Sequence, residues 1–286
     1  MPPSINTNLI SLNAQRNLSS SQSSLAVSMQ RLSSGLRVNS AKDDAAGLAI
    51  AERMQTKVRG MNVAVRNAND AISMSQTAEG ALGKVGDMLQ RMRELAVQAA
   101  NGTNTSADRT SLNDEYLQLS REAARTLGGT QFNGQSILAT TTNSVFQVGA
   151  NTSATLDQIS VTAFDWTSVG EITTAIGAAV GTDPTTAVAG TDGSFALAAI
   201  TAIDAAIDKV NSQRGTFGAV QNRFENVVAT LQTQVENQTA ARSRIMDADY
   251  ATETANLSRA SILQQAGNAM VAQANQLPQQ VLALLR

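Results

Sequence analysis

Apolar residues recur three and four positions apart over long stretches at both ends of this 286-residue chain. This alternation places the apolar side chains on one stripe of a helix and is typical of coiled coils. It predicts a helix over 43–100, ended by Asn101-Gly102 with the glycine in the left-handed conformation. The predicted stripe consists of Ala68, Ala71, Ser75, Ala78, Leu82, Val85, Leu89, Met92, Ala96 and Ala99.

The same spacing predicts helices elsewhere in both halves of the chain. Residues 5–36 carry a seam through Leu18, Leu25 and Leu32, and a shorter helix is expected over 105–127. Another helix begins near residue 194, and the last covers 248–285. In that last helix Leu263, Met270, Leu277 and Leu284 lie seven residues apart.

The middle of the chain lacks a long helical stripe. Asn133-Gly134 between short apolar segments predicts a β-hairpin over 130–138, and Phe146 begins a further strand. Residues 140–193 are rich in Thr, Ala and Gly, and we expect short strands and turns there with one short helix near 171–180. The predicted fold class is mainly α, with long antiparallel coiled-coil-like helices formed by both termini and a small β-rich central outer domain.

Order at both termini is unusual, because chain ends are commonly the least ordered part of a domain. The simplest physical reason is that the two ends pair with each other or with other copies of the chain. The middle would then be a displayed insertion.

Composition excludes most catalytic chemistry. The chain has no cysteine and no histidine, so thiol nucleophiles, imidazole bases and the usual zinc ligands are all missing. We interpret the carboxylate clusters Asp43-Asp44 and Asp247-Ala248-Asp249 as charges at helix N-termini. No catalytic residue, metal ligand or cofactor is therefore expected.

Net charge and hydropathy limit the classes of partner that the chain is expected to bind. A formal charge of −2 offers no basic footprint for nucleic acid. The first residues lack the basic segment and apolar run of a cleaved signal peptide. The apolar end from Leu277 is too short to cross a bilayer, so no membrane insertion is expected. These features fit a cytoplasmic protein or one exported without a cleaved signal.

The segment 89–95 is the most specific motif within a predicted helix. Leu89 and Met92 belong to the apolar stripe, whereas Arg91 and Glu94 lie on other faces. Arg91 and Leu95, one turn apart, would make a mixed surface. This surface is either a solvated helix face or a contact patch.

Together, these motifs resemble those of bacterial flagellin, the filament subunit of the flagellum. The resemblance covers about 1–140 and 195–286, and the middle has no counterpart. It rests on residues 5–8 (INTN), 13–18 (NAQRNL), 31–47 (RLSSGLRVNSAKDDAAG), 89–98, 130–134 (TQFNG) and 274–286 (ANQLPQQVLALLR).

The resemblance implies three domains and a function. Residues 1–43 and 241–286 would form an inner filament-core domain, 44–140 and 194–240 a rod-like helical domain with a β-hairpin, and 141–193 a variable outer domain. The chain would be a structural subunit that polymerises into a helical tube for motility, with no enzymatic activity. Export through the flagellar type III system would place it outside the cell, in the filament.

The resemblance also implies partners and sites. Besides copies of itself, the chain would meet an export chaperone, the filament cap and the hook-junction proteins. A flagellin-sensing toll-like receptor would contact Arg91, Leu95, Gln98 and Glu115, with Leu89 beside them. Inflammasome sensors would read the terminal segment, which an export chaperone also binds: Val281, Leu282, Leu284 and Leu285. The filament seam would include Leu25, Leu32, Leu263, Met270 and Leu277.

Three other functions stay open from the residues. A hook–filament junction protein would share the architecture, but the long match to both flagellin ends argues against it. A flagellin with a metalloprotease insertion would need a His-Glu-x-x-His motif, and the chain has no histidine. A cytoplasmic coiled-coil scaffold would be found only inside cells.

Overall fold

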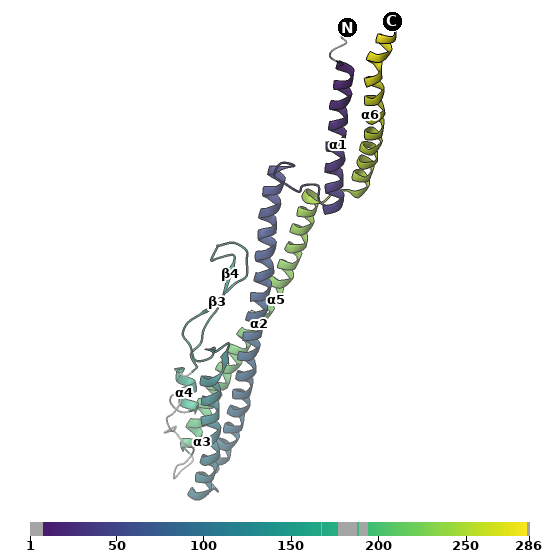
Figure 1. The fold of residues 1–286 in the computed structure, drawn as a ribbon. Coiled ribbons are helices and arrows are strands. Elements are labelled where there is room, and N and C mark those ends of the chain that lie inside the picture. The colour runs from purple at the N-terminus through teal and green to yellow at the C-terminus, as the bar shows by residue number, and fades with distance from the viewer. Residues whose placement is uncertain (1–7, 167, 177–187, 189–193, 285–286) are drawn as a thin grey trace. The chain divides into compact units, whose positions relative to one another are not determined.

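The computed structural model describes residues 8–166, 168–176, 188 and 194–284, with side chains described up to residue 276 in the last helix. Long helices dominate these ranges, and the strands are short (Figure 1). In chain order the elements are α1 (Leu9–Ser34), α2 (Ala45–Ala99), α3 (Ser106–Gly129), β1 (Gln131–Phe132), β2 (Gln135–Ser136), β3 (Ser144–Gln147), β4 (Gln158–Val161), α4 (Gly170–Ile176), α5 (Ser194–Met246) and α6 (Tyr250–Leu284). The mainly α prediction is confirmed.

The chain divides into two compact units. One consists of Met1–Lys57 with Glu236–Arg286, and the other of Val58–Val235. These boundaries differ from those expected near 43/44 and 240/241. The described part of 141–193 lies inside the second unit and contributes to its core.

The core of the second unit is the stripe that the spacing predicts. All ten stripe residues of α2 are buried, from Ala68 to Ala99, with at most 1% of any of them exposed. Ile203, Val210, Phe217 and Phe224 of α5 belong to the same hydrophobic cluster, and α2, α3 and α5 run alongside one another (Figure 1). Burial of each large apolar side chain contributes about 1.5–3 kcal/mol, so this stripe holds the unit together.

One polar residue interrupts the α5 stripe and has a partner. Gln221 Nε2 donates a hydrogen bond of 2.9 Å to Glu79 Oε2 of α2. Pairing across two helices is favourable in only one alignment, so this contact fixes the register of α5 against α2.

The end of α2 is capped differently from the sequence prediction. The helix ends at Ala99, but the left-handed glycines of the described residues are Gly35 and Gly134, so the left-handed stop expected at Gly102 is wrong. Instead the buried Arg109 of α3 donates to the carbonyl oxygens of Ala99 (3.0 Å) and Asn101 (3.3 Å). A guanidinium satisfies the last carbonyls of a helix and complements its negative end.

The predicted hairpin is present and short. Strands β1 and β2 pair antiparallel, Gln131 with Ser136, around a turn in which Asn133 and Gly134 have φ values of 51° and 76°. Two consecutive left-handed residues are the requirement of the hairpin turn that Asn-Gly favours. Strands β3 and β4 form a second antiparallel pair, in register from Ser144 with Val161 to Gln147 with Gln158.

The middle of the chain is anchored to the helices more firmly than its composition suggests. Trp166 is fully buried, and Phe146 packs edge-to-face on Phe224 of α5 with ring centroids 5.7 Å apart. Ile159 and Ile172 belong to the same core as α2. Aromatic and β-branched residues at a few positions therefore provide the packing that a long stripe provides elsewhere.

Three polar side chains of α3 hold the main chain of this central segment. Tyr116 Oη donates to the carbonyl oxygen of Ala175 over 2.7 Å, and Ser120 Oγ donates to that of Ile176. Asn113 Oδ1 accepts from the backbone N–H of residue 188 at 3.0 Å. The spacing of three and four residues puts all three on one face of α3. From that face Tyr116 and Ser120 satisfy the C-terminal carbonyls of α4, and Asn113 holds the backbone at residue 188.

Tyr116 gives the second unit a testable dependence on pH. Burial raises the pKa of its hydroxyl from 10.0 to about 12. The folded state therefore holds this proton more tightly than the unfolded state, and stability falls as pH rises from 10 to 12. The loss reaches about 3 kcal/mol once both values are passed. We expect Tyr116→Phe to remove this loss and to cost about 1–3 kcal/mol at pH 8 by leaving the Ala175 carbonyl unpaired.

Urea unfolding of the second unit at pH 8, 10 and 11 measures both effects. Tyr250→Phe replaces the only other tyrosine, which is 57% exposed in the first unit, and serves as the matched control. Identical pH dependence in the wild type and Tyr116→Phe would contradict the assignment.

Candidate functional site

Helices α1 and α6 of the first unit form an antiparallel pair with the chain ends at the same end of the pair (Figure 1). Polar contacts join them at both ends. Asn8 Nδ2 donates to the carbonyl oxygen of Ala274 over 2.7 Å, and Arg31 pairs with Glu253 at 3.6 Å. Ser11 Oγ donates to Asn275 Oδ1 over 2.6 Å. Contacts at the two ends fix the register of the pair.

The seam between α1 and α6 is narrow and made largely of small or polar residues. Its positions alternate by three and four residues on each helix, as in a coiled coil, and all are buried or half-buried. The seam positions are Ser11, Ala14, Leu18, Ser21, Leu25, Ser28 and Leu32 on α1, and Glu253, Leu257, Ala260, Gln264, Gly267, Val271 and Ala274 on α6. Small side chains let the helices approach closely but bury little apolar area.

At Gly267 the two helices lie so close together that an added side chain would force its neighbour to move. A Cβ built on Gly267 would lie 3.1 Å from Leu18 Cδ1. The leucine of α1 therefore fills the space that the glycine leaves on α6.

The structure separates the predicted filament-seam residues into two groups. Leu25 and Leu32 lie on the α1–α6 seam and are half-buried. Leu263 and Met270 lie off it, with 52% and 60% of their surface exposed. The side chain of Leu277 lies outside the described residues. A second row with the same seven-residue period, Ala260, Gly267 and Ala274, is the one that faces α1.

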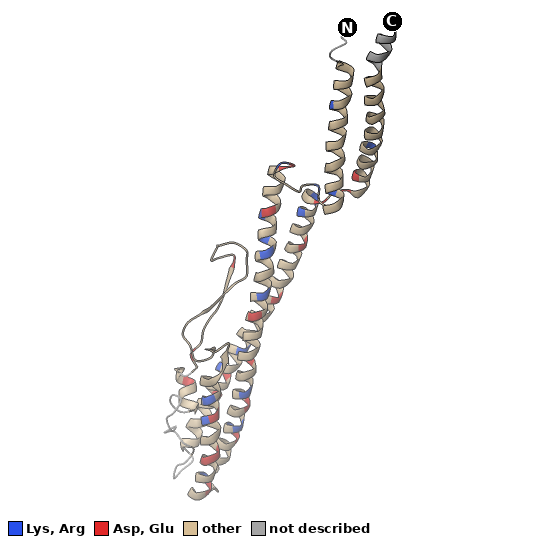
Figure 2. Ribbon diagram, viewed as in Figure 1, with Lys and Arg blue, Asp and Glu red and all other residues tan. Residues whose placement is uncertain are grey.

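The outer faces of the pair carry large apolar side chains and few charges. Leu9, Ile10 and Leu12 of α1 and Ile262 of α6 are 49–64% exposed, as is Met29. The only charged residues in the two helices are Arg16, Arg31, Glu253 and Arg259 (Figure 2). Single exposed apolar residues are ordinary, but a set of them on a nearly uncharged surface marks an interaction site.

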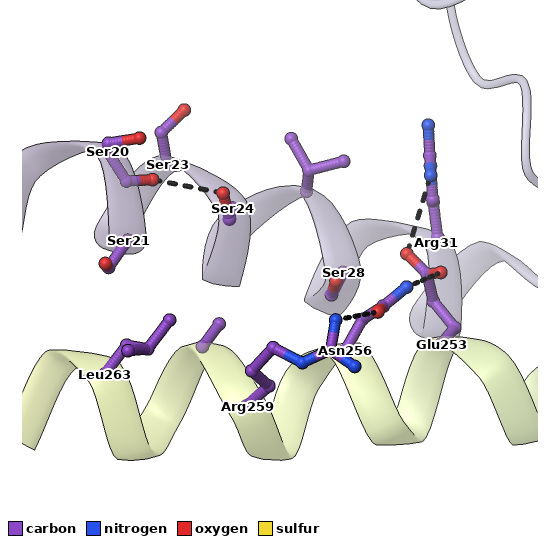
Figure 3. A pocket seen from close by; sticks show the side chains of 12 residues that line it. Ser20, Ser21, Ser23, Ser24, Ser28, Arg31, Glu253, Asn256, Arg259 and Leu263 are labelled. Atoms are coloured by element: carbon purple, nitrogen blue, oxygen red, sulfur yellow. Dashed lines mark hydrogen bonds and ion pairs between the residues drawn. The ribbon is translucent and has the colours of Figure 1, made fainter. Parts of the chain in front are cut away.

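A hollow of about 500 Å³ opens between the helices near Arg31 (Figure 3). Glu253 receives a hydrogen bond from Asn256 as well as the ion pair with Arg31, and Arg259 donates to Asn256. Five serines of α1 line its other side: Ser20, Ser21, Ser23, Ser24 and Ser28. Ser21 and Ser24 donate to carbonyls of their own helix, and Val27 and Leu263 line the hollow beside the polar groups. The hollow is therefore a gap in the packing of the pair.

The carboxylate clusters lie where the sequence predicts them. Asp44 Oδ1 accepts from the backbone N–H of Gly47 at 2.7 Å, and Asp249 Oδ1 from that of Ala251 at 2.9 Å. Hydrogen bonds from Ser40 lower the pKa of the Asp43 carboxyl. Among the described residues, no three Asp or Glu side chains come together as a metal site.

The Arg91 surface lies on α2 and α3 of the second unit. Arg91 donates to Glu94 at 2.8 Å and to Glu115 at 2.9 Å, and these carboxylates raise the pKa of its guanidinium. Gln98 is also exposed. Leu95 is 1% exposed and Leu89 is fully buried, so the mixed surface expected of Arg91 and Leu95 consists of polar side chains instead.

The terminal residues Val281, Leu282, Leu284 and Leu285 have side chains outside the described part of the chain. Within that part, none of the helices combines the length and apolar character required to cross a bilayer.

Comparisons with known proteins decide the family. The model of the bacterial flagellin N-terminal helical region matches residues 5–143, and that of the C-terminal helical region matches residues 200–285. The chain belongs to the flagellin family. The resemblance of its two ends is thereby confirmed.

Flagellins of several bacteria match over nearly the whole length. That of Halalkalibacterium halodurans is 47% identical over 283 residues, covering 99% of both chains. That of Bacillus subtilis is 43% identical over 305 residues, again covering 99% of both. A solved structure of a putative flagellar hook-associated protein from Vibrio parahaemolyticus has a TM-score of 0.56 at 14% identity, over 72% of this flagellin and 100% of that chain. At that identity it shows a shared fold.

Overpacking the seam of this flagellin tests the α1–α6 pair. Gly267→Val places branched carbons against Leu18, which costs about 1–3 kcal/mol in a packed interface. We expect faster amide hydrogen exchange along both α1 and α6 of the variant. Ala269→Val introduces the same side chain at an exposed position of the same helix. It lowers helix propensity, whereas Gly267→Val raises it, so a greater loss of protection in Gly267→Val reports overpacking. Equal protection in α1 for the two variants would contradict the close contact at Gly267.

Proposed function

We propose that this flagellin, a subunit of the bacterial flagellar filament, polymerises through the outer apolar faces of α1 and α6. Copies of the same chain would cover those faces. The observation that supports this most directly is the set of half-exposed large apolar side chains on two helices with only four charges. An apolar surface in contact with water does not lower the free energy of the monomer. An assembly that removes this surface from water is stabilised.

Magnitudes favour coupling between folding and assembly. Ordering each residue costs about 1–2 kcal/mol of backbone entropy, and the serine- and alanine-rich seam returns little apolar burial against it. Each outer Leu, Ile or Met that is covered adds up to about 1.5–3 kcal/mol. The terminal helices are therefore dynamic in the free subunit and become ordered as neighbours supply the missing surfaces.

The geometry of such contacts leads to a filament. One face of a subunit meets a different face of the next, and contacts that do not close on themselves produce a helical polymer. The resulting tube is turned by a motor, and the chain itself supplies stiffness and no catalysis.

Membership of the flagellin family supports a proposal about location and partners. The subunit is exported through the flagellar type III system to the cell exterior, with an export chaperone bound to the end that contains Val281 and Leu284. It then meets the cap and the hook-junction proteins. Host inflammasome sensors would read the same terminal segment.

Charge on an outer face tests the assembly proposal. We expect Leu263→Glu with Met270→Glu to abolish seeded polymerisation at concentrations where the wild type forms filaments. A carboxylate removed from water without a partner costs several kcal/mol. The measurement is sedimentation of polymer, with electron microscopy of the pellets.

The matched control is Gln273→Glu, which adds charge to α6 at an exposed polar position. Circular dichroism checks that helix content is unchanged. Normal filaments from the Leu263/Met270 variant would rule out these residues as a covered face. If the copy number of this chain in isolated wild-type filaments is only a few per filament, the protein is a hook–filament junction protein instead.

A second proposal concerns recognition by a flagellin-sensing toll-like receptor. Arg91, Gln98 and Glu115 form an exposed polar surface across α2 and α3, and the Arg91–Glu115 pair holds the two helices in one arrangement. Leu89 and Leu95 would act from beneath by positioning the helix, because both are buried.

Arg91→Ala should lower receptor activation about tenfold, as loss of a central arginine does at many interfaces. Receptor-reporter cells exposed to purified protein measure the response. Arg125→Ala removes another exposed arginine with a carboxylate partner, Glu122, and is the control. Equal responses from the two variants would refute a role for Arg91.

A further inference from the structure

The sulfur atoms of this chain are all thioethers. The sequence has nine methionines and no cysteine. Among the methionines that the structure describes, two are more than half exposed, Met29 at 58% and Met270 at 60%. Four others are at most 7% exposed: Met61, Met74, Met92 and Met246. Accessibility decides which thioethers an oxidant in solution reaches first, so Met29 and Met270 are the most reactive of the described methionines.

Both exposed methionines lie on the outer faces of the terminal helices. Met270 is two helical turns after Leu263, on the same side of α6, and Ala266 lies between them. Met29 lies on α1, between the half-buried Leu25 and Leu32. The four buried methionines lie instead in the hydrophobic clusters that hold each unit together.

We propose that Met29 and Met270 are reversible oxidation sites that control whether a free subunit can dock, an inference that rests on the assembly function proposed above. The oxidant is a peroxide. The thioether sulfur attacks one peroxide oxygen, an S–O bond forms as the O–O bond breaks, and the leaving oxygen takes up the proton to depart as water. The sulfur loses two electrons to the peroxide. A methionine sulfoxide reductase reverses the change at the expense of two thiols, which become a disulfide.

Oxidation makes the outer face more polar, and this opposes docking. A sulfoxide replaces a soft apolar group by a polar one whose oxygen accepts hydrogen bonds from water. Docking would strip that water without offering a donor, because the surrounding face is apolar. A subunit already docked shields both sulfurs, so the modification discriminates between free and assembled protein.

The test uses the full-length protein and dilute hydrogen peroxide. Mass spectrometry of proteolytic peptides measures sulfoxide at each methionine against time, before and after seeded assembly. We expect Met29 and Met270 to oxidise first in free subunits and to be protected in filaments. The critical concentration of the oxidised protein should rise roughly tenfold or more, the factor expected from burying an unpaired polar group.

Variants assign the effect to these two sulfurs. Met29→Leu with Met270→Leu conserves the apolar character and should polymerise normally with or without peroxide. Met54→Leu with Met88→Leu replaces two half-buried methionines and should remain peroxide-sensitive. Treatment of the oxidised wild type with methionine sulfoxide reductase and dithiothreitol should restore assembly.

Two outcomes would overturn the inference. One is an unchanged critical concentration when Met29 and Met270 are fully converted to sulfoxide. The other is inhibition that follows oxidation of a buried methionine in the time course, a result that the wild type alone can give if the leucine variant assembles poorly. Failure of untreated wild type to polymerise on seeds would contradict the assembly proposal instead.

Discussion

The narrowness of the α1–α6 seam is the constraint on which the rest of this flagellin depends. Serine, alanine and glycine at half of the seam positions bring the helix axes close, as the approach of Leu18 to Gly267 shows. The same small residues remove little apolar surface from water, so the pair is weakly stabilised by itself. Large apolar side chains such as Leu263 and Met270 are placed outside the seam instead. The terminal helices thus keep their strongest hydrophobic groups for contacts with other molecules.

The second unit has the opposite design. Its stripe on α2 carries Leu82, Val85, Leu89 and Met92 inward, and all four are fully buried against α3 and α5. Polar contacts in this unit align its helices. The hydrogen bond from Gln221 to Glu79 sets the register of α5, and that from Tyr116 to the Ala175 carbonyl anchors α4. This unit has a core of its own, which allows the first unit to be dynamic without loss of the whole fold.

The sequence predicted the long helices well because their periodicity runs for many turns, as the stripe from Ala68 to Ala99 illustrates. It did not predict which of two equally regular rows on α6 faces α1, since Leu263-Met270 and Ala260-Gly267-Ala274 share one period and only the partner helix distinguishes them. The anchoring of the middle was also missed. Trp166 and Tyr116 do their packing and hydrogen bonding with residues distant in sequence, and no local pattern records such pairs.

The connection between α2 and α3 shows that the residue that caps a helix determines which nearby positions can be substituted. Because the carbonyls at the end of α2 are satisfied by the buried Arg109, Gly102 has no special backbone conformation to maintain, and a Cβ there would meet open space. The glycine that looks indispensable is therefore replaceable, whereas the arginine ten residues beyond Ala99 is not. Among related chains, we expect position 102 to be variable and an arginine to be conserved at position 109.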